Sequence, residues 1–169
     1  MKPCITLTGS ERRRDMINTE KTVTDLAGRL KIVDSCDMCR LGLTDGKRVS
    51  VIPVSFGYTF LNGNFTFYMK GDWDDRVMKL LREAEEIAFQ MDSDHCMLPV
   101  ENGEYTMFYN CAEGYGKPVF LEDTEEKKTA MKHLLAHYLP REDTATDIPW
   151  EEACMLKLEV TELDCKVCR

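Results

Sequence analysis

The chain has 169 residues, of which 43% are hydrophobic and 31% charged, as in an ordinary globular domain. Its formal net charge of −8 disfavours binding to nucleic acid or to an anionic membrane, because both surfaces are themselves negative. No apolar run is long enough to cross a bilayer, and the N-terminus lacks the apolar core of a signal peptide. We therefore expect a cytoplasmic protein with a single domain over residues 1–169, in which residues 1–10 and 165–169 are peripheral.

The first half of the chain predicts one helix followed by three antiparallel strands. Apolar residues recur at helical spacing before the first strand and predict a helix from about Glu20 to Val33. Two turn signals, Asp45-Gly46 and Asn62-Gly63, then separate runs that are typical of strands, and such pairs are strong hairpin signals. The predicted strands are Cys39 to Thr44, Arg48 to Phe60 and Phe65 to Lys70.

The second half predicts further strands and two more helices. Helical periodicity covers about Asp75 to Glu86, and Asp123 has the position of a cap before a second helix that ends ahead of Pro140. The expected strands are Ile87 to Met91, Tyr105 to Tyr109 (with an extension through Glu113 and a resumption at Lys117 to Leu121 left open) and Cys154 to Leu163. This order of elements predicts an α+β fold built on a closed antiparallel barrel.

Four segments of the chain carry a family resemblance through their residues and their order. They are Arg12-Arg13-Arg14-Asp15, DGKRVSVIPVSFGY from residue 45, NFTFYMKG from residue 64 and AEGYGKPVFLEDTEEKKTAMKHLLAHY from residue 112. Together they resemble the flavin-binding split barrels of the pyridoxamine 5'-phosphate oxidase superfamily, in particular the branch related to the 5-nitroimidazole resistance proteins. The resemblance covers roughly residues 10 to 165. It implies an antiparallel split β-barrel of six strands in Greek-key-like order, with flanking helices.

The resemblance also implies a cofactor, a partner and an activity. The cofactor is flavin mononucleotide (FMN), and the partner is a second copy of the chain, with FMN at the homodimer interface. The implied activity is that of an FMN-dependent oxidoreductase that reduces small electrophiles such as nitroimidazole-type compounds. The alternative is a non-catalytic protein of the same fold that binds or stores flavin, haem or deazaflavin. No catalytic nucleophile stands out in the chain, which agrees with chemistry carried by a cofactor.

The chain offers the features that FMN requires of a protein. The phosphate needs cations or aimed backbone N–H groups, and the ring needs a rigid polar edge and an apolar wall. The candidate cations are Lys70 at a strand end, Arg76 near a helix start, and Arg48; the resemblance points to the first two. The remaining candidates are the ring edge Val49, Ser50, Val51, Ile52, Pro53 and Val54, then Tyr68 and Met69 on the next strand, and Trp150, which would close the site from the partner chain.

The same residues also have plainer interpretations. Lys70 reads equally as a solvated charge at a strand end, and Arg76 as the surface partner of Asp72. Asp72, Asp74 and Asp75 lie within the proposed phosphate loop, where they would weaken the binding of a dianion unless they point outward or cap the next helix. Asp74 and Asp75 both have the position of an N-cap residue.

Two C-x-x-C pairs, Cys36 with Cys39 and Cys165 with Cys168, have the spacing of a zinc site. The first pair enters a predicted strand, where residues three apart face opposite sides, and the second lies at a C-terminus expected to fray. We therefore expect no metal site, packing cysteines in the first pair and free thiols in the second, with zinc as the alternative. His95, in a polar loop beside Cys96, has no evident catalytic partner in the sequence.

Overall fold

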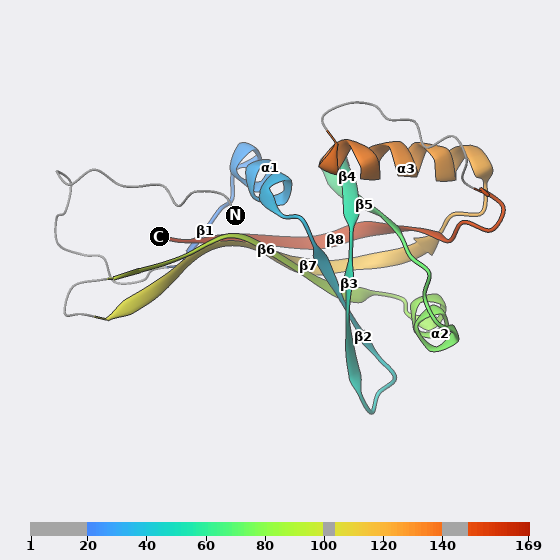
Figure 1. Ribbon diagram of the computed structural model, residues 1–169, viewed down its shortest axis with the longest axis horizontal. Coiled ribbons are helices and arrows are strands. Elements are labelled where there is room, and N and C mark those ends of the chain that lie inside the picture. The colour runs from blue at the N-terminus through green and yellow to red at the C-terminus, as the bar shows by residue number, and fades with distance from the viewer. Residues whose placement is uncertain (1–19, 100–103, 140–148) are drawn as a thin grey trace.

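The computed structural model describes residues 20–99, 104–139 and 149–169, which form an antiparallel sheet of eight strands flanked by three helices (Figure 1). The arginine-rich opening and residues 1–10 lie outside the described residues. The predicted α+β class is confirmed. In chain order the elements are β1 (Glu20–Thr22), α1 (Leu26–Ser35), β2 (Cys39–Thr44), β3 (Val49–Val54), β4 (Phe56–Leu61), β5 (Asn64–Lys70), α2 (Asp75–Glu83), β6 (Ile87–Pro99), β7 (Tyr105–Phe120), α3 (Thr124–Tyr138) and β8 (Met155–Cys168).

The strands follow the order β3-β2-β6-β7-β8-β5-β4, and β1 pairs with β8. β3 and β4 stand at opposite ends of this order, yet only Ser55 separates them in the chain. The sheet therefore returns on itself at Ser55 and encloses the core. The predicted six-stranded, Greek-key-like barrel is not confirmed, because the run Arg48 to Phe60 breaks at Ser55 into two strands and Glu20–Thr22 adds another.

Two apolar clusters stabilise this arrangement. Burial alternates along β5, so that Phe65, Phe67 and Met69 point into the barrel, as the period of two in a strand requires. A smaller cluster lies between α3 and the sheet, and Tyr68, which points to the other face of β5, packs against it with Trp150. The buried members of the smaller cluster are Leu121, Ala130, Met131, Leu134 and Met155.

Each helix begins at an aspartate that caps its first turn. The side chain of Asp25 accepts a hydrogen bond from the Gly28 N–H, so α1 begins at Leu26, and the predicted start at Glu20 is wrong. Asp74, one of the two candidate caps, caps α2 through the Val77 N–H at 2.8 Å. Asp123 caps α3 as predicted. Residues before Asp25 instead form β1, because they pair with the end of β8.

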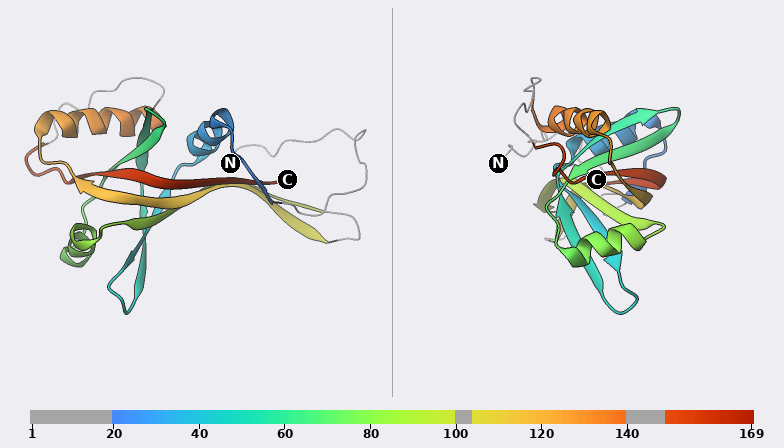
Figure 2. Two further views of the ribbon diagram at one scale, coloured as in Figure 1. Left: turned by 180° about the vertical axis from the view of Figure 1, so that it is seen from behind. Right: turned by 90° about the vertical axis from the view of Figure 1, so that its right-hand side faces the viewer.

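The helices lie on two sides of the long strands: α1 and α3 on one side, α2 near the opposite end of the barrel (Figures 1 and 2). α3 lies directly on the backbone of β4, since a Cβ added at Gly57 would come within 2.1 Å of the His133 carbonyl oxygen. The hydroxyl of Tyr138, at the end of α3, accepts from the Phe56 N–H and donates to the Asp37 carbonyl, both at 2.9 Å. The last turn of α3 is thereby tied to the point where β3 becomes β4.

The last three strands are longer than their sequence patterns suggested. β6 continues beyond Met91 to Pro99, with a β-bulge between Ser93 and Cys96, and β7 runs without interruption. β8 extends to Cys168 and pairs there with β7 and β1, so residues 165–168 belong to the sheet and are not peripheral. Among the helices of the described residues, none combines the length and hydropathy needed to cross a membrane.

Candidate functional site

The predicted ring edge, Val49–Val54, forms β3, which is an edge strand. β3 pairs with β2 along one side, and no described strand pairs with its other side. Its outward side chains are exposed: Val49 keeps 74% and Val51 62% of its accessible surface. Pro53 lacks an N–H group and so limits the addition of another strand at this edge. The remaining backbone groups of this edge are available to hydrogen-bond a flat ligand.

The two main candidate cations stand toward opposite ends of β3. Lys70 follows Met69, which pairs with Phe56, so Lys70 lies beside the Ser55 junction at the end of β3. Arg76, in the first turn of α2, reaches the β2–β3 hairpin at the other end, where its Nη2 lies 3.4 Å from Asp45 Oδ2. A strand of six residues is about 17 Å long. The free edge of β3 is therefore flanked by a cation near each end.

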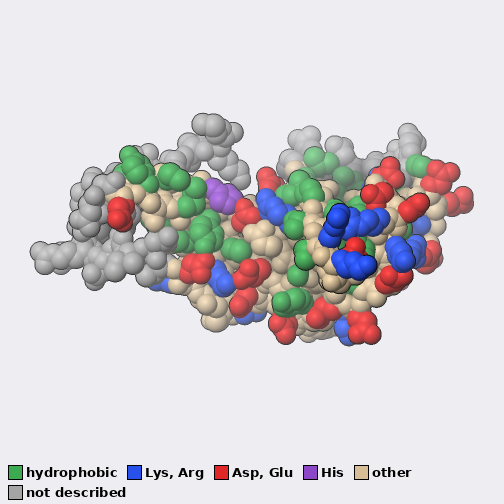
Figure 3. Space-filling view, turned by 90° about the horizontal axis from the view of Figure 1, so that it is seen from below, with side chains coloured by type: hydrophobic (Ala, Val, Ile, Leu, Met, Phe, Trp, Pro, Cys, Tyr) green, Lys and Arg blue, Asp and Glu red, His purple; other side chains and the backbone are tan. Residues whose placement is uncertain are grey.

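A hollow of about 500 Å³ lies between α2 and the β2–β3 hairpin, and Arg76 lines it. The other lining residues are Thr44, Asp45, Lys79, Leu80, Glu83 and Ala84. The Lys79 ammonium lies 3.8 Å from Glu83, an exposed pair of little energetic weight. Basic side chains gather at this end of the molecule (Figure 3). The hollow is thus large enough for a phosphate group and offers it cations.

Asp45 is the main carboxylate competing for Arg76, and the sequence did not single it out. Its Oδ1 accepts the backbone N–H groups of Arg48 at 2.8 Å and Lys47 at 2.9 Å. These two hydrogen bonds, and then the nearby Arg76 guanidinium, lower the pKa of Asp45 below its usual value. Asp45 therefore carries its charge at neutral pH, and a bound phosphate would have to displace it from Arg76. The predicted pair between Arg76 and Asp72 is not the one formed.

The acidic loop before α2 opposes phosphate binding less than its sequence suggested. Asp74 is occupied as the helix cap, while Asp72 and Asp75 are exposed. Trp73, between them, folds over Gly71 and packs against the main apolar cluster. A Cβ at Gly71 would lie 2.0 Å from the Trp73 ring, so only glycine fits this contact. The loop is thereby held in one conformation next to Lys70.

Three of the predicted residues lie away from the edge of β3. Met69 is fully buried in the barrel. Tyr68 stacks on His133 of α3, with ring centroids 5.2 Å apart, and its hydroxyl lies 3.3 Å from Thr59 Oγ1. The backbone carbonyl of Trp150 accepts from Lys127 Nζ at 3.1 Å, and its side chain is partly buried below α3. The structure therefore brings Tyr68 and Trp150 together beneath α3 rather than beside Val49–Val54.

One polar cluster was missed from the sequence. His95 Nε2 lies 2.6 Å from Asp92 Oδ2, while Asp92 Oδ1 accepts from Arg40 at 2.7 Å and from Gln90 at 2.8 Å. His95 therefore pairs with Asp92, and it lies within β6 and not in a loop as predicted. The β-bulge after Ser93 brings His95 and Asp92 together, and no local sequence pattern predicts such a bulge.

Three buried cysteines among the described residues behave as packing residues. Cys36, Cys39 and Cys165 are buried, and burial raises the pKa of the first two to about 12 and of the third to about 11. Such thiols are protonated at neutral pH and are poor nucleophiles. Cys165 and Cys168 lie buried in β8, so the expected fraying of the C-terminus at this pair is wrong. Within the described parts of the chain, no three His, Cys, Asp or Glu side chains are placed to hold a metal ion.

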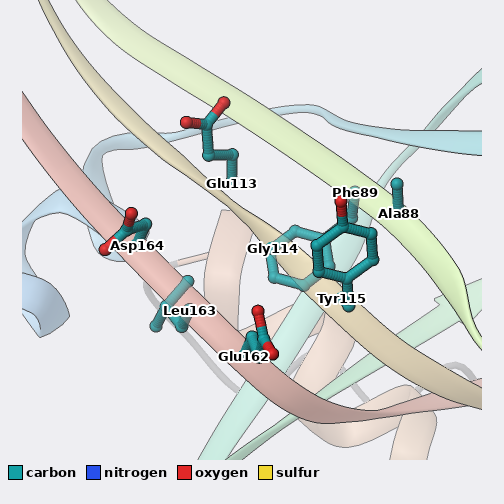
Figure 4. Close-up of a pocket in the computed structure, with 8 residues that line it drawn as sticks. All are labelled: Ala88, Phe89, Glu113, Gly114, Tyr115, Glu162, Leu163 and Asp164. Atoms are coloured by element: carbon teal, nitrogen blue, oxygen red, sulfur yellow. The ribbon is translucent and has the colours of Figure 1, made fainter.

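A second hollow, of about 480 Å³, lies over β6, β7 and β8 (Figure 4). Glu113, Glu162 and Asp164 surround it, together with the Tyr115 ring. Lys166 pairs with Glu113 at 2.6 Å, and no cation of the described residues forms an ion pair with Glu162 or Asp164. An anionic phosphate is therefore disfavoured here, which leaves the hollow beside Arg76 as the better phosphate site.

Solved structures of other proteins share this fold. A candidate 5-nitroimidazole antibiotic resistance protein from Bacteroides thetaiotaomicron matches with a TM-score of 0.76 and 21% identity, over 95% of this chain and 96% of its own. An FAD- and haem-binding protein from Mycobacterium smegmatis matches with a TM-score of 0.65 and 15% identity, over 89% of this chain and 73% of its own. An FAD-binding protein from Mesorhizobium loti matches with a TM-score of 0.63 and 14% identity, over 90% of this chain and 98% of its own. At these identities the likeness shows a common fold. No curated protein matches the chain.

The sequence itself carries a more specific signal. The family model described as pyridoxamine 5'-phosphate oxidase matches residues 26–167. This span runs from the first residue of α1 to the last residue but one of β8 and so includes the edge strand β3 and the α2 hollow. The chain belongs to the pyridoxamine 5'-phosphate oxidase-like family.

Proposed function

We propose that the chain binds FMN along the free edge of β3 and acts as an FMN-dependent oxidoreductase on small electrophiles such as nitroimidazole-type compounds. The observation that carries the proposal is the edge strand Val49–Val54, open on one side and flanked by Arg76 and Lys70. Flavin-binding proteins with the same fold support it.

The residues present fit this cofactor. FMN is about as long as β3, so its phosphate would lie at one end of the strand and its ring along the rest. Arg76 is the better phosphate ligand of the two cations, because it lines the α2 hollow and begins a helix whose N–H groups attract anions. Arg48 lies on the same hairpin and would add a more distant positive charge.

Backbone groups of β3 would orient the ring and stabilise the negative charge of the reduced flavin. The bound flavin would supply the hydride-transfer chemistry. The outward side chains Val49, Val51 and Pro53 would provide the apolar wall. A homodimer with FMN at the interface is part of the proposal, since this strand is open and apolar in a single chain. Tyr68 and Trp150, which lie beneath α3 and away from this edge, would then contact the flavin only from the partner chain.

A second candidate is a non-catalytic protein of the same fold that binds or stores flavin or another cofactor. The ion pair between Arg76 and Asp45 favours this candidate, because it would lower the affinity for a phosphate dianion. The existence of an FAD- and haem-binding protein with this fold supports haem as an alternative ligand.

The test is a visible absorption spectrum of the purified protein, recorded before and after incubation with FMN and removal of unbound cofactor. We expect a bound flavin band, and its loss on adding NADPH or dithionite followed by recovery on adding a nitroimidazole. Parallel incubations with FAD and haem identify the cofactor. Flavin that binds and is reduced but is never reoxidised by the nitroimidazole would support the non-catalytic candidate, and a protein that retains no flavin would overturn the proposal.

A further inference from the structure

A third hollow, of about 260 Å³, lies where the start of α1 meets the tip of the β4–β5 hairpin and the middle of β8. It is here called the α1 hollow. α1 and the hairpin stand on the same side of the long strands (Figures 1 and 2). None of the described residues that line it lies on β3 or α2, so the α1 hollow is separate from the proposed flavin site.

The walls of the α1 hollow are apolar and belong to the rim of the main cluster. Phe60 pairs directly with Phe65 across the hairpin, and their ring centroids lie 4.8 Å apart. Val160 and Leu163 of β8 pack against the same cluster but stay only partly buried, as does Phe60. The core is therefore incompletely covered at this point, and an apolar group placed here would remove further apolar surface from water.

A β-bulge in β8 shapes one wall of the hollow. The pairing of β7 with β8 skips Thr161, which is the extra residue of the bulge. Residues three apart in a regular strand face opposite sides, yet Val160 and Leu163 both line the hollow, because the bulge lies between them. Bulges that re-aim side chains in this way are over-represented next to active sites.

Arg29 supplies the charge of the α1 hollow. Among the described residues that line it, Arg29 is the only charged one. Its Nε donates a hydrogen bond to the Val23 carbonyl at 3.2 Å, which helps to hold the guanidinium in place. Within the described parts of the chain, no carboxylate forms an ion pair with Arg29 and no acceptor takes its two Nη groups. These two groups form the fork that binds a carboxylate through two parallel hydrogen bonds.

The carboxylates nearest to Arg29 in the fold are engaged elsewhere. Asp25 lies four residues before Arg29, a spacing that allows an ion pair on a helix. Its Oδ1 instead accepts the Gly28 N–H at 2.8 Å and caps α1. Glu86 Oε1 accepts the hydroxyl of Thr161 at 2.6 Å. Arg29 thus differs from Arg76, which is already paired with a carboxylate of the chain.

We propose that the α1 hollow binds a small aromatic carboxylate, with its carboxylate on the Nη groups of Arg29 and its ring against Phe60, Val160 and Leu163. The hollow is smaller than the roughly 300–1,000 Å³ of sites for drug-sized ligands, so the ligand is about the size of phenylacetate. A phosphate ester is disfavoured, because a dianion would meet a single cation and turn its other oxygens toward apolar walls. The proposal goes beyond the flavin site and does not depend on it.

Binding should stabilise the fold, because the ligand would connect three elements that are far apart in the chain. A ligand that binds the folded state and not the unfolded one raises the stability in proportion to the logarithm of its concentration above the Kd. We therefore expect phenylacetate to raise the thermal midpoint of the protein as its concentration increases. Phenylacetamide, which lacks the charge, and acetate, which lacks the ring, should raise it much less.

The direct test is the Kd of phenylacetate for the purified chain without added flavin, measured by saturation-transfer NMR. We expect a Kd in the millimolar range or below, and values at least ten times higher for phenylacetamide and for acetate. The first comparison reports the contact with Arg29, and the second reports the apolar walls.

Two variants locate the site. Arg29→Gln should weaken phenylacetate binding at least tenfold, while Lys31→Gln, the matched control at an exposed position of the same helix, should leave the Kd unchanged. Val160→Phe keeps Arg29 and fills part of the hollow, so it should also weaken binding at least tenfold. Circular dichroism spectra close to that of the wild type establish that the variants fold.

Binding at the α2 hollow is distinguished by Arg76→Ala, which should leave the Kd of phenylacetate unchanged. Loss of binding in Arg76→Ala, unchanged binding in either Arg29→Gln or Val160→Phe, or a Kd of phenylacetamide equal to that of phenylacetate would each overturn the proposal. A wild type that does not bind phenylacetate would overturn it as well. None of these measurements involves flavin, so their outcome is independent of the proposed oxidoreductase activity.

Discussion

The hydroxyl of Tyr138 accepts a hydrogen bond from the backbone N–H of Phe56 at 2.9 Å, across 82 residues of sequence. Phe56 is the first residue of β4, directly after the junction at which the barrel returns on itself. The N–H group at such a break has no ladder partner of its own, and an unsatisfied buried donor is costly. Tyr138 thus completes the backbone hydrogen bonding where the two ends of the sheet order meet.

Removing this hydroxyl should destabilise the fold. We expect Tyr138→Phe to lower the free energy of unfolding by about 1–3 kcal/mol, because the Phe56 N–H and the Asp37 carbonyl both lose their partner. Urea unfolding followed by circular dichroism measures the change. Tyr115→Phe is the control, since its exposed ring has no hydrogen bond of this kind. A loss of equal size in both variants would contradict the assigned role of Tyr138.

Removing Arg76 should weaken FMN binding more than removing Arg48. Arg76 lines the α2 hollow in the first turn of the helix, whereas Arg48 lies on the hairpin and does not line the hollow. A charge-assisted contact to phosphate contributes about 1.5–3 kcal/mol, so Arg76→Ala should raise the Kd roughly 10- to 100-fold. Fluorescence quenching of FMN on titration measures both variants. Equal affinities of the Arg76→Ala and Arg48→Ala variants for FMN would contradict the assignment of Arg76 as the phosphate ligand.

Neutralising Asp45 should have the opposite effect. Asp45→Asn keeps a side-chain oxygen to accept the Lys47 and Arg48 N–H groups but releases Arg76 from its ion pair. We expect the Kd for FMN to fall a few-fold at most, because an exposed ion pair is weak. Asp72→Asn, a neutralisation in the exposed loop before α2, should change the affinity less. A larger gain from Asp72→Asn would mean that the acidic loop, and not Asp45, opposes the phosphate.

His133 should make stability depend on pH. Desolvation lowers the pKa of His133 below its unfolded value, so the unfolded chain binds more protons than the folded one as the pH falls through the range near 6.5. Stability contributed by neutral His133 is therefore present at neutral pH and lost on acidification. We expect His133→Gln to reduce the fall in urea midpoint between about pH 7.5 and pH 5.5. A steeper fall in the variant would contradict this sign.

The sequence by itself determined the elements whose stabilising contacts are local. Asp123, and Asp74 as one of two candidates with Asp75, were predicted as helix caps because a cap bonds an N–H two or three residues away. The Asp45-Gly46 and Asn62-Gly63 turns predicted both hairpins correctly. Gly46 and Gly63 have positive φ, which glycine adopts without steric cost and without any distant contact. Arg76 and Lys70 were likewise identified as candidates because they lie near the start of a helix and the end of a strand, and local sequence signals mark both positions.

The tertiary structure decided the contacts between residues far apart in the chain. The break at Ser55 follows from β3 pairing with β2 while β4 pairs with β5. The pairing of Arg76 with Asp45 depends on which elements lie side by side, and so does the placement of Tyr68 and Trp150 in one cluster. Strand pairing is selected by the burial of side chains from the whole chain at once, and no window of sequence contains that information.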